Sequence, residues 1–324
     1  MNLILTMRTG ASKLALFCLL GLMPLLAQTS PPEAAEPEAA SSEGTIKVNV
    51  KLVNVFSTVT DQNGAPIGKL EKKDFQVLED GVPQTIAYFG KENELPLSIV
   101  LAVDASLSTK KDLALELESA RRFAHAILRP IDKMSLYRFA ETVQEMVPFT
   151  ANLERIDHAI RNVRVGAATA LYDAVYLASE ALESRDGRKV LVVITDGGDT
   201  VSSVDYAEAL RQAQASEAVV YSIVVVPIEA SAGRNTGGEH ALIQLSHDTG
   251  GKHYYASSAS ELEQVFKQIS DELRTQYLLA YYPKQRPSAG EFRRIEVRVI
   301  EPNNPDAENI KVRHRTGYYV HGSK

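Results

Sequence analysis

The chain has 324 residues, 44% of them hydrophobic and 23% charged, so it is long enough for one large folded domain and a smaller one. The formal net charge is −6 and no stretch is strongly basic, which excludes the positive footprint that a nucleic-acid partner needs. The only cysteine is Cys18, inside an N-terminal apolar run. The rest of the chain therefore has no disulfide, and any metal site in it would use oxygen or imidazole ligands.

The N-terminus has the features of a secretory signal peptide, residues 1–27. Arg8 and Lys13 precede an apolar run that is too short to span a bilayer comfortably. An uncleaved anchor is the alternative, because Leu25 stands where the cleavage site favours a small residue. Residues 28–44 contain three prolines, four glutamates and no basic residue, which predicts a disordered linker. We therefore expect an exported protein of the periplasm, outer envelope or extracellular space, with no membrane span after cleavage.

Two β-rich segments lie at the ends of the remaining chain, at residues 45–95 and 276–324. Alternation of β-branched and polar residues predicts strands at 46–59, 75–78, 84–89, 277–282, 292–300 and 310–320. Asp80-Gly81 is a favoured hairpin turn. Neither segment is large enough to be stable alone, so we expect the two to pair as one small β-sandwich. Two independent appendages are the alternative.

Between these segments, residues 96–275 alternate apolar strands with amphipathic helices. This pattern predicts an α/β fold with a doubly wound, mainly parallel sheet. Residues 97–103 form a continuous apolar run, typical of a parallel strand covered on both faces. Further strands are expected at 135–139, 143–149, 189–194 and 218–226. Helices are expected at 113–127, 153–160, 171–182, 204–215, 239–246 and 262–273.

Oxygen side chains follow these strands. Asp104, Ser106 and Ser108 come after the first apolar strand, Asp196 comes after the strand at 189–194, and Thr169 lies in a loop that leads into a helix. The carboxyl ends of strands in an open parallel sheet meet at one edge, so these side chains can share a centre. Such a hard-oxygen site suits a divalent cation: Mg²⁺, with Mn²⁺ or Ca²⁺ as alternatives. Neutral hydroxyl ligands leave the cation positive, so its open side would accept a carboxylate from a partner protein.

The segments 104–108, 166–173 and 195–197 resemble the metal-ion-dependent adhesion site of von Willebrand factor A (VWA) domains. The resemblance implies that Ser106, Ser108 and Thr169 contact the metal, and that Asp104 and Asp196 act directly or through water. Ala105 replaces the usual glycine, a departure that should not disturb ligation. The flanking β segments look like those of bacterial "VWFA-related" proteins, which are abundant in Acidobacteria.

Other polar residues fit less specific roles. Asp173, one helical turn beyond Thr169, is expected to support or cap the site, and Asp199 to be a solvated turn residue. Asp61-Gln62-Asn63-Gly64 is expected to be a hairpin turn, because the remaining ligands of a calcium loop are missing. The loop 227–238 follows a buried strand and should border the metal edge. We expect its Glu229 and Arg234 to help select partners.

These patterns predict a non-enzymatic, adhesion-type protein-binding module whose metal coordinates an acidic residue of a partner protein. An envelope assembly or co-chaperone factor with the same domain is the alternative. A metal-dependent hydrolase would need a general base beside the metal and an enclosed pocket, and the sequence shows neither. A structural role with a vestigial metal site is a further alternative.

Overall fold

The computed structural model describes residues 52–91, 95–226, 236–285, 288–300 and 310–320. The predicted signal peptide and linker lie outside these described residues. Within the described ranges, no helix combines the length and the apolar character needed to cross a membrane. The strands form one six-stranded sheet and two four-stranded sheets. The large sheet belongs to the α/β part of the chain, and the two small sheets come from its two ends.

The six-stranded sheet has the order β10-β9-β8-β5-β6-β7. Its strands are β5 (Leu97–Asp104), β6 (Lys133–Phe139), β7 (Val143–Thr150), β8 (Arg188–Thr195), β9 (Val219–Val225) and β10 (His253–Ala256). All neighbours pair in parallel except β7, which runs antiparallel to β6 at one edge. Every residue of β5 is buried, as expected for a central strand with both faces covered. The predicted doubly wound, mainly parallel sheet is confirmed.

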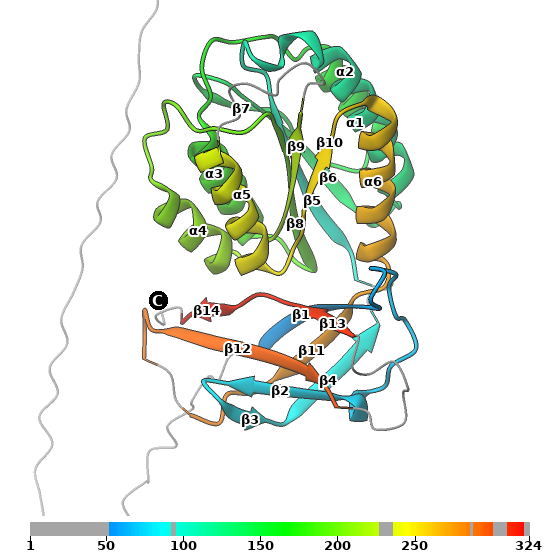
Figure 1. Ribbon diagram of the computed structural model, residues 1–324, viewed down its shortest axis with the longest axis vertical. Helices are drawn as coiled ribbons and strands as arrows, with labels where there is room; N and C mark the ends of the chain where they lie inside the picture. The colour runs from blue at the N-terminus through cyan, green and yellow to red at the C-terminus, as the bar shows by residue number, and fades with distance from the viewer. Residues whose placement is uncertain (1–51, 92–94, 227–235, 286–287, 301–309, 321–324) are drawn as a thin grey trace, which may run out of the picture. The chain divides into compact units, whose positions relative to one another are not determined.

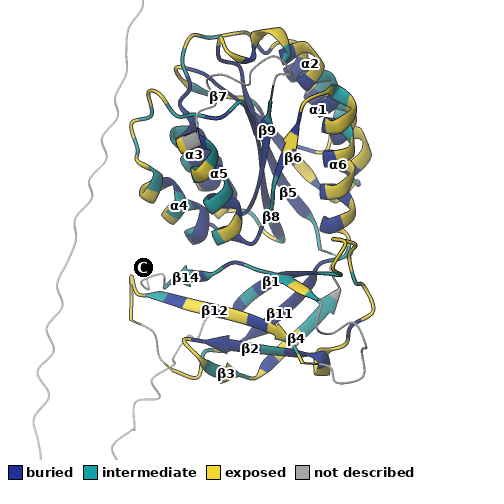
Figure 2. Cartoon of the chain, viewed as in Figure 1, coloured by how far each residue is buried: buried dark blue, intermediate teal, exposed yellow. Residues whose placement is uncertain are grey.

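Helices cover both faces of this sheet (Figure 1). They are α1 (Leu113–Ile127), α2 (Leu153–Arg161), α3 (Leu171–Glu183), α4 (Tyr206–Ala215), α5 (Thr236–Thr249) and α6 (Ala259–Leu273). Side chains of α1, α2 and α6 pack into the core on one face, and those of α3, α4 and α5 into the core on the other. The burial colours follow this division, because each helix buries the side that faces the sheet (Figure 2).

The two terminal β segments form one sandwich, as the sequence predicts. One sheet has the order β13-β1-β11-β4 and the other β14-β12-β2-β3. The N-terminal segment supplies β1 (Val53–Thr60), β2 (Phe75–Glu79), β3 (Val82–Gln84) and β4 (Ile86–Lys91). The C-terminal segment supplies β11 (Tyr277–Tyr281), β12 (Phe292–Val299), β13 (Lys311–Arg313) and β14 (Gly317–Tyr319). A single apolar cluster contains buried side chains from both segments, such as Val55, Val77, Leu279 and Val297.

The two short turns of the N-terminal segment are also confirmed. Asp80 and Gly81 have φ values of 46° and 79°, and they join β2 to β3 in a two-residue hairpin loop. The Asp61 carboxylate accepts hydrogen bonds from the backbone N–H groups of Asn63 and Ala65, both at 2.8 Å. This carboxylate oxygen stabilises the turn that the sequence predicts.

A buried polar cluster links the end of α6 to the strands around it. The Glu272 carboxylate accepts hydrogen bonds from Tyr221 Oη at 2.6 Å and Thr58 Oγ1 at 3.2 Å. It also forms an ion pair with Arg313 at 2.5 Å. These partners lie on β9, β1 and β13, so one carboxylate joins elements of the α/β part and of the sandwich.

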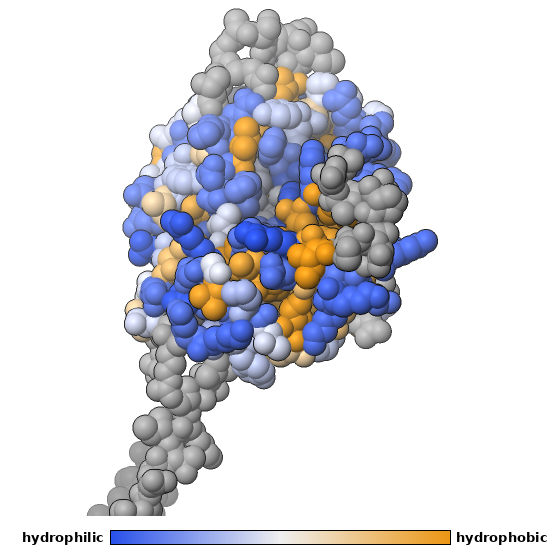
Figure 3. Space-filling model, turned by 60° about the horizontal axis from the view of Figure 1, so that its bottom comes forward, coloured by the Kyte–Doolittle hydropathy of each residue, from blue (hydrophilic) through white to orange (hydrophobic). Residues whose placement is uncertain are grey.

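Apolar side chains also remain on the surface. On the face in Figure 3, hydrophilic residues cover most of the area, one larger apolar patch lies near the centre, and smaller apolar areas are scattered around it. Across the described residues, the more exposed large apolar side chains include Leu107 at 59%, Val201 at 47% and Val165 at 38%. Single exposed apolar residues are ordinary, but these three come from loops at the same edge of the six-stranded sheet.

Candidate functional site

The candidate site begins at the carboxyl ends of β5 and β8, which are neighbours in the sheet. The chain leaves β5 toward α1 on one face and leaves β8 toward α4 on the other, and ligands bind in open α/β sheets where connections diverge in this way. Asp104 ends β5 and is fully buried. Its Oδ2 accepts a hydrogen bond from Thr195 Oγ1 at 2.7 Å, and its Oδ1 accepts one from the Ser106 N–H at 2.8 Å. These bonds fix the carboxylate at the switch point.

Backbone hydrogen bonds join the three predicted loops. The Gly166 N–H donates to the Ala105 carbonyl at 2.7 Å, which ties the second loop to the first. The Thr200 N–H donates to the Thr169 carbonyl at 2.8 Å, and the Thr169 N–H donates to Thr200 Oγ1 at 2.9 Å. The second loop is therefore also tied to the third, which begins at Asp196. The structure brings the three sequence-predicted segments to one place.

Two glycines allow this close packing. A Cβ atom on Gly166 would lie 2.2 Å from a carboxylate oxygen of Glu141, and one on Gly238 would lie 2.1 Å from the Gly197 carbonyl oxygen. The first contact seats the second loop against the end of β6. The second brings the start of α5 against the third loop. Gly197 itself has a φ of 139°, in the region that favours glycine.

The hydroxyl groups of two predicted cation ligands lie within hydrogen-bond distance of each other. Ser106 Oγ and Ser108 Oγ lie 2.9 Å apart. Ligands at 2.0–2.1 Å from an octahedral Mg²⁺ are separated by about 2.9 Å when they occupy adjacent positions. Thr169 is 5% exposed, and its hydroxyl makes no hydrogen bond to the described residues that competes with this role. The donor set therefore fits a hard divalent cation, with Ser106, Ser108 and Thr169 as candidate ligands.

The two aspartates of the site differ in environment. Asp196 is partly exposed, whereas Asp104 is buried and has both oxygens engaged in hydrogen bonds. Burial raises the pKa of Asp104 to about 6, and the charge of Asp196 acts in the same direction. Hydrogen bonds from Thr195 and Ser106 oppose this rise. Asp104 is thus suited to orient a water molecule on the cation, while Asp196 is more accessible.

A further carboxylate, which the sequence analysis does not single out, lies near these residues. Glu116 in the first turn of α1 is 2% exposed, and neither of its carboxylate oxygens has a hydrogen-bond partner among the described residues. Burial raises its pKa to about 8, and the charges of Asp104, Asp112 and Asp196 add to that rise. The sequence contains a signal for this burial, because Glu116 lies one helical turn before Ala120 and therefore falls on the apolar face of the helix.

The remaining sequence-predicted residues have supporting roles or lie outside the described chain. Asp173 Oδ1 accepts hydrogen bonds from the N–H groups of residues 203 and 204, at 2.9 and 3.0 Å, so it organises the third loop. Asp199 is half-buried and accepts a hydrogen bond from the Tyr172 N–H at 3.3 Å. It therefore caps α3 and is not the solvated turn residue that the sequence predicts. Glu229 and Arg234 lie outside the described residues.

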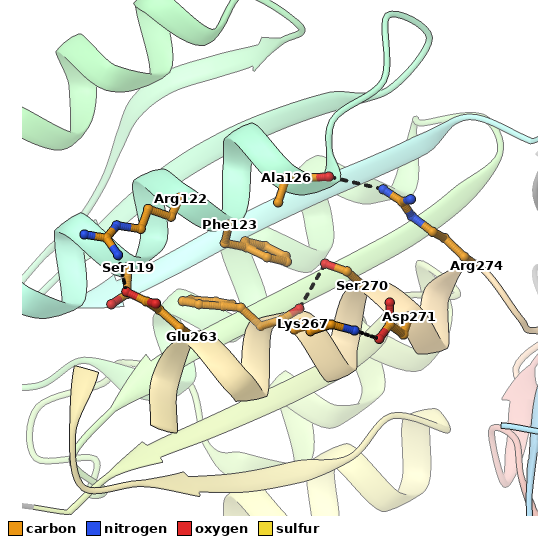
Figure 4. A pocket seen from close by; sticks show the side chains of 10 residues that line it. Ser119, Arg122, Phe123, Ala126, Glu263, Lys267, Ser270, Asp271 and Arg274 are labelled. Atoms are coloured by element: carbon orange, nitrogen blue, oxygen red, sulfur yellow. Dashed lines mark hydrogen bonds and ion pairs between the residues drawn. The ribbon is translucent and has the colours of Figure 1, made fainter. Parts of the chain in front are cut away.

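The groove between α1 and α6 is a separate feature of the same helix (Figure 4). Phe123 and Phe266 stack in it with ring centroids 4.4 Å apart. Arg122 pairs with Glu263 at 2.6 Å across the groove, and Arg274 donates to the carbonyl of residue 126 at 3.1 Å. These contacts hold α1 firmly against α6. The first turn of α1, which carries Glu116, leads into this anchored part of the helix.

Residues 99–198 match the family model of the von Willebrand factor type A domain, and this segment includes all five predicted metal residues. BatB from Bacteroides thetaiotaomicron is similar in structure, with 19% identity and a TM-score of 0.45 over 54% of this chain and 98% of that one. An aerotolerance-related membrane protein from Bacteroides fragilis has 20% identity and a TM-score of 0.42 over 55% and 98%.

The PilB minor pilin from Streptococcus sanguinis has 12% identity and a TM-score of 0.45 over 57% of this chain. The chain covers 62% of that pilin. No curated protein sequence matches the chain. The family match covers residues 99–198, and the ligand of the site has to be inferred from its residues.

Proposed function

We propose that this chain is a non-enzymatic protein-binding module that uses a divalent cation, Mg²⁺ first, to coordinate an acidic residue of a partner protein. The observation that carries the proposal is the pair of serine hydroxyls, Ser106 Oγ and Ser108 Oγ, held 2.9 Å apart at the switch point of a VWA-type sheet. We further propose that the protein acts in the bacterial envelope or outside the cell.

In this proposal each group of the site has a distinct task. The cation, when bound, supplies a Lewis-acidic position for a carboxylate oxygen. Ser106, Ser108 and Thr169 hold it through neutral oxygens, which leave its positive charge available to the partner. Asp104 and Asp196 balance part of that charge, directly or through water.

The surroundings of the site support a protein partner rather than a small substrate. Each of the three loops carries one exposed apolar side chain: Leu107, Val165 and Val201. Contacts that surround a central hot spot of an interface exclude water from it, and this exclusion strengthens the central polar contact. The rim that these three side chains form would contact residues that flank the partner's carboxylate.

Magnesium should stabilise the wild-type protein and leave Asp104→Ala unaffected. Binding to the folded state alone raises the free energy of unfolding by about 2.7 kcal/mol at a cation concentration of 100 times Kd. Thermal melting with increasing Mg²⁺, and with chelator as reference, measures this. In parallel, capture of envelope proteins should require Mg²⁺ and be competed by free acetate. Equal Mg²⁺-induced shifts in wild type and variant would contradict the metal site, and chelator-resistant capture would contradict the carboxylate mechanism.

Leu107→Ser should weaken partner binding while leaving cation binding unchanged, because the side chain lies on the rim and supplies no ligand atom. The loss should be about 1–2 kcal/mol, or roughly 5- to 30-fold in Kd. Leu177→Ser is the matched control, since Leu177 is an exposed apolar residue of α3 at 39% exposure. If the two substitutions weaken the binding of a captured partner equally, the apolar side chains around the site do not contact that partner.

A further inference from the structure

Glu116 is the most unusual charged residue near the site. It is 2% exposed, and both of its carboxylate oxygens lack a hydrogen-bond partner in the described part of the chain. A buried carboxylate without a partner is strongly unfavourable, so such a group is normally paired, protonated or bound to a cation. No lysine, arginine or histidine among the described residues donates a hydrogen bond to it. Its surroundings therefore lack the positive charge that an ionised Glu116 needs.

The charged groups that face Glu116 are all acidic. They are Asp104 at the end of β5, Asp112 at the cap of α1 and Asp196 in the loop after β8, and each raises the pKa of Glu116 in addition to the effect of burial. Two of the three are predicted residues of the cation site. Glu116 stands in the first turn of α1, the helix that follows the Asp104–Ser108 loop along the chain.

We infer that Glu116 is a further acidic member of the cation site, which positions a water molecule on the bound ion. This inference rests on the proposed function. A contact through water is inferred and not a third direct carboxylate ligand, because the described carboxylate, histidine and cysteine side chains do not converge in any group of three that could hold a metal ion. A water between Glu116 and the cation satisfies one of the unpartnered oxygens and brings the missing positive charge near it.

The local structure is suited to such a positioning residue. The Glu116 N–H donates to the Asp112 carbonyl at 3.0 Å, so the side chain leaves a formed first turn and not a loose end. The stacked rings of Phe123 and Phe266 hold the helix in place. The positive end of the helix dipole also lies at this turn and partly compensates the negative charge. In this inference Glu116 adds its negative charge to those of Asp104 and Asp196 through a water molecule, without joining them as a third direct ligand.

The test is calorimetric titration of Mg²⁺ into wild-type protein, Glu116→Gln, Glu118→Gln and Asp104→Ala. Glu116→Gln preserves volume and removes the charge, and it should weaken Mg²⁺ binding about 10- to 100-fold. Glu118→Gln is the matched control, because Glu118 lies on the same helix with a side chain that is 42% exposed. It should bind Mg²⁺ like wild type. Melting curves without cation verify that each variant folds. If the glutamine variant does not fold, Glu116→Asp replaces it, because this variant keeps the charge. Glu116→Asp should bind Mg²⁺ more tightly than Asp104→Ala does.

Proton release gives a readout that a purely structural role would not change. At pH 7, Mg²⁺ binding should release a proton from the wild-type protein. Repeating the titration in buffers of different ionisation enthalpy measures the number of protons released. Glu116→Gln should release fewer protons than wild type. Wild-type affinity and proton release in Glu116→Gln, together with lost binding in Asp104→Ala, would overturn the inference while leaving the proposed function intact. Unchanged Mg²⁺ binding in Asp104→Ala would instead overturn the proposed site itself.

Discussion

Replacing Glu79 with alanine is expected to lower the free energy of unfolding by about 3–5 kcal/mol, the range for breaking a buried ion pair. Glu79 is fully buried at the end of β2, and it forms an ion pair with Arg293 at 3.0 Å. It also accepts hydrogen bonds from Tyr281 Oη at 2.6 Å and Tyr318 Oη at 3.0 Å. Burial raises the pKa of both tyrosines, so their hydroxyls stay protonated as donors.

The loss is large because Glu79 comes from the N-terminal β segment and its three partners come from the C-terminal one. Alanine would leave a buried guanidinium and two buried hydroxyls without this acceptor. Glu296→Ala on β12 is the control, since Glu296 is half exposed and pairs with Arg298 at 2.5 Å on the surface. Its effect should stay within about 0.5 kcal/mol. Urea denaturation of both variants measures the difference, and comparable losses would show that this cluster does not hold the sandwich together.

The sandwich could be predicted because its physical signals are local and strong. Residues 46–59 alternate apolar and polar side chains. In β1 the residues 53–56 alternate between buried and half-buried positions, whereas residues 57–59 are all buried. Each of the two terminal β segments has an apolar face that it cannot bury alone. Their pairing is therefore predicted from the apolar area that each would otherwise expose to water. The partners of Glu79 could not be predicted, because they depend on strand register across more than 200 residues of sequence.

Short elements were harder to predict. The strand β10, His253–Ala256, was missed because four residues are too few for an alternation to be recognised. It exists because parallel pairing with β9 satisfies its backbone groups. The helix α5 is longer than the predicted 239–246, since it begins at Thr236 in a glycine-rich stretch that looks like a loop. Tertiary packing of Gly238 against Gly197 replaces the missing helix propensity there.

Within the site, the sequence indicated the loops better than the carboxylates around them. Strand-end positions are enough to bring Ser106 and Asp196 to one edge. Thr169 comes from the loop between α2 and α3, and its hydrogen bonds to Thr200 hold it beside the loop after β8. Glu116 was overlooked because a glutamate in the first turn of a helix is ordinary as a partner of the helix dipole. Only its burial distinguishes it from Glu118, which forms ion pairs with arginines at the surface.

Raising the pH from about 5 to about 8 without cation is expected to lower the free energy of unfolding by an amount on the order of 3 kcal/mol, chiefly through Glu116. The pKa of this carboxyl is raised from 4.5 to about 8 in the folded protein. Between these values the folded protein keeps a proton that the unfolded chain has released, so each rise in pH favours unfolding. Asp104, with a pKa of about 6, acts in the same direction over the lower part of this range.

The difference between wild type and Glu116→Gln isolates this contribution, because other groups titrate in the same range. Burial lowers the pKa values of His253 and His314, and this makes stability rise with pH, opposite to the carboxyl effect. The stability of Glu116→Gln relative to wild type should therefore increase from pH 5 to pH 8 in urea titrations without cation. Saturating Mg²⁺ should reduce that increase, because the cation favours the ionised carboxylate. A stability difference that stays constant across the range would show that Glu116 titrates normally and has no electrostatic coupling to the site.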